Sequence, residues 1–147
     1  MAAYNSSNSS TLLTASSDKV RVLSEVVDFA STTNAASDSF DVIGIPANSL
    51  VIAAGCDVLT ADTAGNSGTI AIGDSASSGY YVAAVAPSAT GQLTITDDSK
   101  VYSAANDIRI TVATGAINAK VRVWATVISL DKGGLERDTE SQSVTFA

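Results

Sequence analysis

The segment from Ile117 to Leu130, INAKVRVWATVISL, decides the fold, because its side chains sort into two faces only if the chain is extended. The apolar face consists of Ile117, Ala119, Val121, Val123, Ala125 and Val127. The other face consists of Asn118, Lys120, Arg122, Trp124 and Thr126. A helical period does not separate these two sets, so the segment is predicted to be a strand.

This strand is long enough to cross a whole domain. At roughly 3.3 Å per residue it would reach about 45 Å, whereas a compact chain of this length has a radius of gyration of about 15 Å. The other strands are therefore expected to pack around it, with a bend or bulge along its length. Nothing in the segment itself indicates a reaction.

The composition favours one β domain with a core of small side chains. The chain has 147 residues, which is enough for a single domain with a real core. Hydrophobic residues make up 46 % of it but aromatic residues only 5 %, so Val, Ile, Leu and Ala are expected to fill the core. Such a core favours a thin sandwich over an aromatic-lined ligand pocket.

Charge and missing residue types argue against several functions. The net charge is −7, so no basic stripe is available to bind nucleic acid. The absence of histidine removes the commonest general base, the usual zinc ligand and the Ser-His-Asp triad. No apolar run is long enough to span a membrane, and the N-terminus does not resemble a secretory signal. The single cysteine, Cys56, lies in an apolar run and is interpreted as a small buried hydrophobic residue.

About eight short strands and no convincing helix are predicted. The segments with strand character besides 117–130 are 18–29, 40–59, 69–73, 80–86, 93–96, 100–102 and 108–112. A bulge or face switch is expected near Leu23, although a helix can also be drawn there, and 80–86 is either a short strand or an ordered loop. A corner is expected at 46–49, and 114–116 is predicted to be a hairpin turn into the long strand. Strands spaced by roughly ten residues are typical of an antiparallel β-sandwich or jelly roll.

An N-terminal arm is expected to precede the β-sandwich domain, residues 18–130. Residues 1–17 carry no charged side chain and are dominated by Ser, Thr, Asn and Ala, so they cannot bury enough surface to order unaided. The segment is either a floppy terminus or an arm that orders only against a partner. Its apolar anchors would be Tyr4, Leu12 and Leu13.

Further candidate contact residues lie in the C-terminal tail and on the long strand. Residues 131–147 form a polar tail, in which Val144 and Phe146 either dock on a neighbour or make no contact. Trp124 shares the polar face of the long strand with two basic residues. Either this face packs under another sheet or loop, or it is an exposed row of contact residues, for which Trp and Arg are favoured anchors.

The acidic residues form no recognisable catalytic or metal site. Asp57, Asp62 and Asp74 lie near predicted strand ends, but a calcium cage needs a shaped loop with six to eight oxygens, so they are interpreted as solvated loop acids. Glycosidase chemistry needs two positioned carboxylates, and two of the three glutamates lie in the tail. The glycines at 65–68 and 133–134 read as turns and not as phosphate cradles, because no helix follows them. No cofactor and no metal are expected.

Several stretches resemble small structural proteins of tailed bacteriophages. They are FDVIGIPANSLVIAAGCDVLTA (40–61), GTIAIGD (68–74), ANDIRITV (105–112) and AKVRVWATVISL (119–130). The shared pattern is an IPA turn, a long strand, a strand of small residues that ends in Gly-Asp, and a closing strand rich in Val. Over roughly residues 38–130 the chain is similar to capsid decoration (cement) proteins of jelly-roll or β-sandwich type, or to related fibre and knob modules.

The resemblance implies a non-enzymatic virion structural protein that decorates and cements the outer surface of the capsid. It implies the major capsid protein as a partner. Repeated capsid sites have local two- or threefold symmetry, so a homo-oligomer is expected, with a trimer favoured over a dimer. No catalytic residue carries over, because the family has no catalytic motif.

Two other classes of function stay open. A receptor- or glycan-binding module of a phage fibre or knob would present exposed aromatic side chains at one loop end, where Tyr80 and Tyr81 are the candidates. A polysaccharide-degrading enzyme would need a carboxylate pair in a groove, and Asp57 or Asp74 would be the residues to test.

Overall fold

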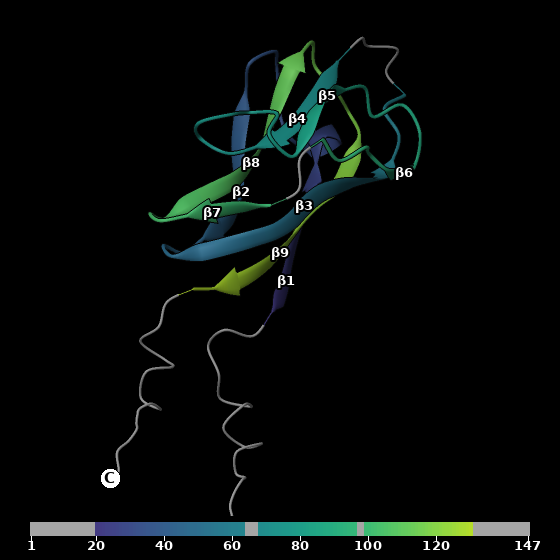
Figure 1. Ribbon diagram of the computed structural model, residues 1–147. Coiled ribbons are helices and arrows are strands. Elements are labelled where there is room, and N and C mark those ends of the chain that lie inside the picture. The colour runs from purple at the N-terminus through teal and green to yellow at the C-terminus, as the bar shows by residue number, and fades with distance from the viewer. Residues whose placement is uncertain (1–19, 64–67, 97–98, 131–147) are drawn as a thin grey trace, which may run out of the picture.

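The computed structural model describes residues 20–63, 68–96 and 99–130, which form an antiparallel β-sandwich (Figure 1). Its elements are β1 (Arg21–Asp28), the 3-10 turn η1 (Phe29–Ser31), β2 (Ser39–Ile45), β3 (Ser49–Thr60), β4 (Thr69–Gly73), β5 (Val82–Val85), β6 (Gly91–Gln92), β7 (Lys100–Tyr102), β8 (Asn106–Thr114) and β9 (Lys120–Ser129). One sheet has the order β1-β9-β3-β6, with β7 also paired to β3, and the other has the order β2-β8-β4-β5. The predicted all-β sandwich is confirmed, with nine strands in the described ranges against about eight expected.

Strand β9 lies between β1 and β3 and has the two faces that the sequence predicts. Its inward side chains are all buried: Val121, Val123, Ala125 and Val127. Ile117 and Ala119, just before the strand, are buried as well. Cys56 lies opposite Val123 on β3 and is buried in the same core, as expected. The apolar face of this one strand therefore lines the core along the length of the five-stranded sheet.

The strand pairs are nested within one another. Strand β1 pairs with β9, β2 with β8, β3 with β6 and β7, and β4 with β5. Strands β1 to β4 alternate between the two sheets, so the chain turns a corner after each of the first three, whereas β4 is followed by β5 in its own sheet. The corner predicted at 46–49 is confirmed: it joins β2 to β3 in the opposite sheet, and Asn48 takes a φ of 58° there. The hydrophobic core fills the space between the sheets.

The segment after β8 crosses between the sheets, so the predicted hairpin at 114–116 is wrong. Strand β8 pairs with β2 and β4, whereas β9 pairs with β1 and β3. Gly115 provides the bend with a φ of 61°. Asn34 then holds the crossing chain: its Oδ1 accepts from the Ile117 amide (2.9 Å), and its Nδ2 donates to the Ile117 carbonyl (3.0 Å). A Thr-Gly-Ala turn permits a bend but does not say which strand it leads to.

Two other predictions of local structure are wrong. Strand β1 pairs with β9 in an unbroken register, without the bulge expected near Leu23. Its two alternating sets of residues lie on opposite faces of one continuous strand. Residues 93–96, which are expected to form a strand, are not in one, because the short strand β6 ends at Gln92. The Leu93 amide donates to the Cys56 carbonyl (2.9 Å) in one sheet, and the Thr96 amide donates to the Tyr81 carbonyl (2.7 Å) beside the other, so this segment also crosses over.

The start of β1 and the end of β9 lie side by side, since Arg21 pairs with Val127 (Figure 1). The arm and tail predicted from the sequence fall within residues 1–19 and 131–147, which lie outside the described residues. Both flanking segments therefore join the sandwich at the same end of the five-stranded sheet.

The substitution Asn34→Ala is expected to lower the free energy of unfolding by about 1–3 kcal/mol, because it leaves the amide of the buried Ile117 without a partner. Urea unfolding followed by circular dichroism measures the change. Thr33→Ala, an exposed position in the same loop, is the matched control and is expected to change stability by less than about 0.5 kcal/mol. Equal losses in the two variants would contradict the role given to Asn34.

Candidate functional site

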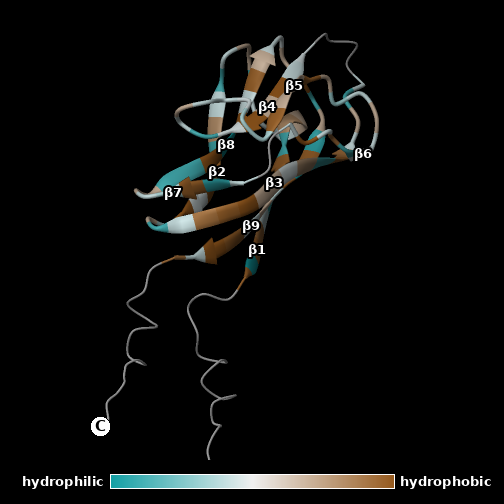
Figure 2. Cartoon of the chain, viewed as in Figure 1, coloured by the Kyte–Doolittle hydropathy of each residue, from teal (hydrophilic) through white to brown (hydrophobic). Residues whose placement is uncertain are grey.

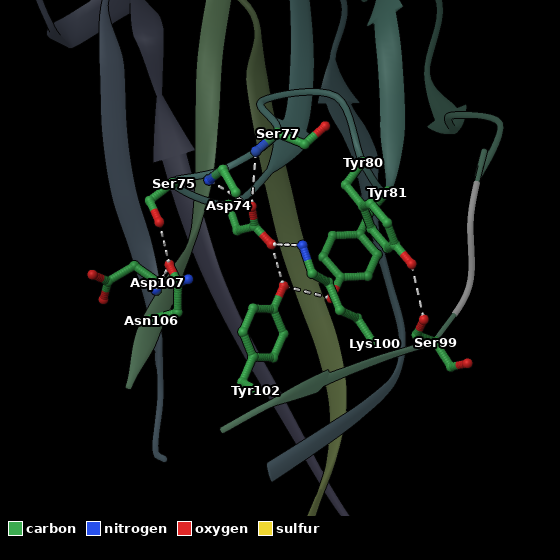
Figure 3. Close-up of polar contacts among 11 residues, drawn as sticks. Asp74, Ser75, Ser77, Tyr80, Tyr81, Ser99, Lys100, Tyr102, Asn106 and Asp107 are labelled. Atoms are coloured by element: carbon green, nitrogen blue, oxygen red, sulfur yellow. Dashed lines mark hydrogen bonds and ion pairs between the residues drawn. The ribbon is translucent and has the colours of Figure 1, made fainter. Parts of the chain in front are cut away.

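Asp74 directly follows β4 and is the centre of a polar cluster between the two sheets (Figure 3). Its Oδ1 accepts hydrogen bonds from the backbone amides of Ala76 and Ser77, both at 2.9 Å. The loop thereby folds back over the strand end, and a Cβ on Gly73 would collide with the Ser77 carbonyl oxygen. The Gly-Asp strand end thus has a physical reason: glycine makes room for the loop, and aspartate holds it.

The second carboxylate oxygen binds two side chains from β7. Asp74 Oδ2 accepts from Lys100 Nζ at 2.6 Å and from the Tyr102 hydroxyl at 2.7 Å (Figure 3). The Tyr102 hydroxyl also lies 2.8 Å from that of Tyr81. Because Tyr102 donates its only hydroxyl proton to the carboxylate, Tyr81 must donate to Tyr102. The chain of bonds joins the end of β4, in the four-stranded sheet, to β7, in the five-stranded sheet.

The aromatic residues of this region cover the cluster. Lys100 Nζ lies 4.5 Å from the centre of the Tyr80 ring, within range of a cation–π interaction. The Tyr80 hydroxyl donates to the Ser99 carbonyl (3.0 Å), and the Tyr80 and Tyr81 rings meet edge to face. Tyr81 is fully buried. The pair of exposed aromatic side chains that a glycan-binding module would need at this loop is therefore not present.

The electrostatics of the cluster indicate that the Asp74 carboxylate stays charged near neutral pH and does not exchange a proton there. Burial alone would raise the pKa of Asp74, but hydrogen bonds from Lys100, from Tyr102 and from two backbone amides outweigh it and lower the pKa to about 2. Burial raises the pKa of Tyr81 to about 12, and burial together with its hydrogen bonds raises that of Tyr102 further. Near neutral pH the carboxylate is charged and both phenols are protonated. The prediction that Asp74 is a solvated loop acid is wrong, since its side chain is 0 % exposed.

Other residues weighed from the sequence are not brought together. Asp62 accepts a hydrogen bond from the Asn118 amide (3.3 Å), and Asp57 lies half-buried on the side of β3 that faces away from the core. Within the described ranges, no group of three His, Cys, Asp or Glu residues could hold a metal ion. Burial, with the nearby charge of Asp57, raises the pKa of Cys56 to about 12, so this thiol is not ionised near neutral pH. In the same ranges, no helix is long and apolar enough to cross a membrane.

Trp124 is the one predicted contact residue in the described ranges. It lies on the outer face of the five-stranded sheet, the side turned away from β2, β4, β5 and β8. Its ring occupies the place of the side chain that Gly55 lacks, where a Cβ would come within 2.7 Å of ring atom Cζ2. The tryptophan is therefore half-buried against its own sheet, and the described residues add no third layer over it. The other predicted contact residues, Tyr4, Leu12, Leu13, Val144 and Phe146, lie outside the described residues.

No local pattern in the sequence joins the members of the polar cluster. Asp74 and Lys100 are 26 residues apart, and Asp74 and Tyr102 are 28 apart. The one local sign was the Gly73-Asp74 strand end, which marks a sharp turn but not its long-range partners.

Solved structures share this fold, whereas no protein-family model and no curated protein sequence matches the chain. A chain of the acid-stable capsid of Helicobacter pylori bacteriophage KHP30 aligns with a TM-score of 0.61 and 10 % identity, over 76 % of this chain and 89 % of that one. A chain of the cyanophage Pam1 capsid aligns with a TM-score of 0.58 and 20 % identity, over 75 % and 84 %. A chain of the Ralstonia phage GP4 capsid aligns with a TM-score of 0.58 and 18 % identity, over 77 % and 86 %. At such identities the likeness is one of fold.

Asp74→Asn is expected to remove an acid-sensitive part of the stability. A carboxyl group with a pKa of about 2 in the folded protein and 3.8 as its ordinary value stabilises the fold above pH 4 and loses this contribution as the pH falls towards 2. Above pH 4 the variant should therefore be less stable than the native protein by on the order of 2 kcal/mol. The gap should close near pH 2.

Urea unfolding between pH 2 and pH 7 measures this gap. Asp57→Asn removes the same charge outside the cluster and is expected to cost less than Asp74→Asn at neutral pH. A gap between native protein and Asp74→Asn that stays constant down to pH 2 would contradict the assignment of the charge effect to Asp74.

Proposed function

We propose that this protein is a non-enzymatic structural protein of a tailed-bacteriophage virion, which decorates the outer surface of the capsid and cements it. The observation that carries the proposal is the shared fold with chains of three phage capsids, each matched over 84–89 % of its own length. Full-length matches of this kind favour the same type of subunit over a common β-module embedded in a larger protein.

The nested strand order supports a jelly-roll fold. In a jelly roll, two Greek keys wrap into a double sheet, an architecture that viral capsid domains use. Here β1-β9-β3-β6 faces β2-β8-β4-β5, so the first and last strands of the chain are neighbours and the middle strands pair with each other. Lectin domains also use this architecture, but the buried Tyr81 and the covered Tyr80 give no support to a glycan-binding module.

The chemistry of the domain supports a structural role. The buried carboxylate of Asp74 accepts hydrogen bonds on both oxygens and has a pKa of about 2, so it does not serve as a general acid or base near neutral pH. The chain has no histidine to take that part. What the residues do provide is a stiff block in which the strands, the small-residue core and the polar cluster support one another.

We assign the contact with the major capsid protein to the arm and the tail. Arg21 pairs with Val127, so both segments join the sandwich at one place. Their apolar anchors, Tyr4, Leu12 and Leu13 before the sandwich and Val144 and Phe146 after it, would bind across a joint between capsomers. Binding only to the assembled lattice stabilises that lattice by mass action.

Deleting residues 1–17 is expected to abolish binding to empty shells that lack this protein, while the sandwich stays folded, because the arm supplies the anchors. Co-sedimentation with such shells measures binding, and circular dichroism checks the fold. The full chain is expected to bind at a fixed ratio to capsid subunits. Unchanged binding of the shortened chain would remove the arm from the mechanism, and binding of the full chain to cells or sugars instead of shells would overturn the proposed function.

A pair of substitutions distinguishes the effect of the apolar anchors on shell binding from the effect of the length of the arm. Leu12→Ser with Leu13→Ser keeps the length and is expected to weaken shell binding as the deletion does. Ser9→Ala with Ser10→Ala alters two neighbouring residues without removing an apolar anchor and is expected to bind like the native chain.

A further inference from the structure

The two outer faces of the sandwich differ in chemistry. The four-stranded sheet presents polar pairs to the outside: hydroxyl groups of Ser39 and Thr111 lie 2.8 Å apart, and Arg109 forms an ion pair with Asp41 at 2.7 Å. Thr69 and Thr114 add a further pair of hydroxyl groups at 3.0 Å. This face is suited to remain in water.

The outer face of the five-stranded sheet has an apolar end, which consists of four exposed residues, Val20, Val22, Ile52 and Val101, and two half-buried ones, Leu50 and Ile128. Val101, Leu50 and Ile128 lie in one row across β7, β3 and β9. Val22 lies opposite Thr126 in the adjoining row. Val22 is 69 % exposed and Val101 is 59 % exposed. Figure 2 shows β3 and β9 as hydrophobic over much of their visible length, with residues of the buried inner face contributing to this colouring. So many exposed apolar side chains on one face are typical of a protein interface.

The other end of the same face is charged but balanced. Asp28 lies opposite Lys120, with an ion pair at 3.8 Å, and Asp57 lies opposite Arg122. The face therefore carries two acids and two bases on a chain whose net charge is −7. Most surfaces of two such acidic chains repel each other, whereas two copies can bring this neutral face together.

The edge of the sheet is less suited to association than its face. Strand β1 has only β9 as a partner in the described ranges, so its other edge is open. Arg21 and Glu25 lie opposite the inward-facing Val127 and Val123, which places two charged residues on the core side of this edge strand. Inward-pointing charges on an edge strand disfavour the addition of another strand.

We propose that copies of this chain associate through the outer face of the five-stranded sheet, with the apolar end at the centre of the contact. This surface would join the copies whether or not the protein is part of a capsid. Because β1 begins and β9 ends at the apolar end, association there gathers the chain ends of the copies around one axis. Arms from several copies would then start from a common point.

The double variant Val22→Lys with Val101→Lys tests the surface, with Val85→Lys as the matched control. Val85 is 37 % exposed on β5, in the other sheet. The full-length native chain and Val85→Lys are expected to sediment as one oligomer. The double variant is expected to sediment as a single folded chain, with a dissociation constant raised on the order of 100-fold or more.

Trp124 provides a second measurement, made on protein that circular dichroism shows to be folded, because unfolding would also expose this ring. It is the only tryptophan and lies on this face. Dilution of the native oligomer should shift its emission to longer wavelength and increase quenching by acrylamide, whereas the folded double variant should show the diluted spectrum at every concentration. A native chain that is monomeric at all concentrations, or an oligomer that survives both lysines, would overturn the proposal. An intact oligomer that fails to bind shells would instead contradict the proposed function alone.

Discussion

Everything in this fold depends on one extended strand that hydrogen-bonds on both edges and packs on one face. Strand β9 pairs with β1 and β3 along nearly its full length, so its backbone donors and acceptors are satisfied within the sheet. Its inward residues are Val and Ala, so it contributes only small side chains to the core. The only large ring on its outer side, that of Trp124, fits because the neighbouring strand has Gly55 beneath it. The same strand thus contributes small side chains to the core and one large ring to the outer face.

A core of small aliphatic residues does not by itself specify how the strands are placed relative to one another. The polar cluster helps to specify this placement. Isoleucine and valine side chains tolerate many arrangements of similar volume, whereas a buried carboxylate requires specific donors. Asp74 receives two from its own loop and two from β7, so one relative placement of β4 and β7 satisfies it. Lys100 keeps part of its side chain exposed, which reduces the cost of bringing its charge to the cluster. The charge therefore helps to specify how the sheets are joined, besides the acid-sensitive stability that it contributes.

Local patterns predicted the strands well and their partners poorly. The alternation in Val121 to Val127 depends only on which face is buried, and it was correct to the residue. The chain does bend at Gly115, but the hairpin predicted there is wrong, because the chain crosses to the opposite sheet, where Asn34, far away in sequence, binds Ile117. In the same way, Asp74 looked like a loop acid because the lysine and tyrosine that bury it lie on β7. The extra alternating set in β1 suggested a bulge, since sequence alone does not show that the outward valines of this strand are exposed.

The outward valines of β1 belong to the surface proposed for association. A strand that needed only to cover the core would be expected to carry polar residues on its outer side, as β8 does with Arg109 and Thr111. Strand β1 instead presents Val22 and Val26 to the outside. A subunit with one hydroxyl-rich face and one apolar face has a built-in orientation, because only the second gains free energy when it is covered. The two chain ends leave from the border of that second face. In the proposed arrangement, association of copies and anchoring by the flanking segments use the same end of the sandwich, and the hydroxyl-rich sheet remains exposed to water.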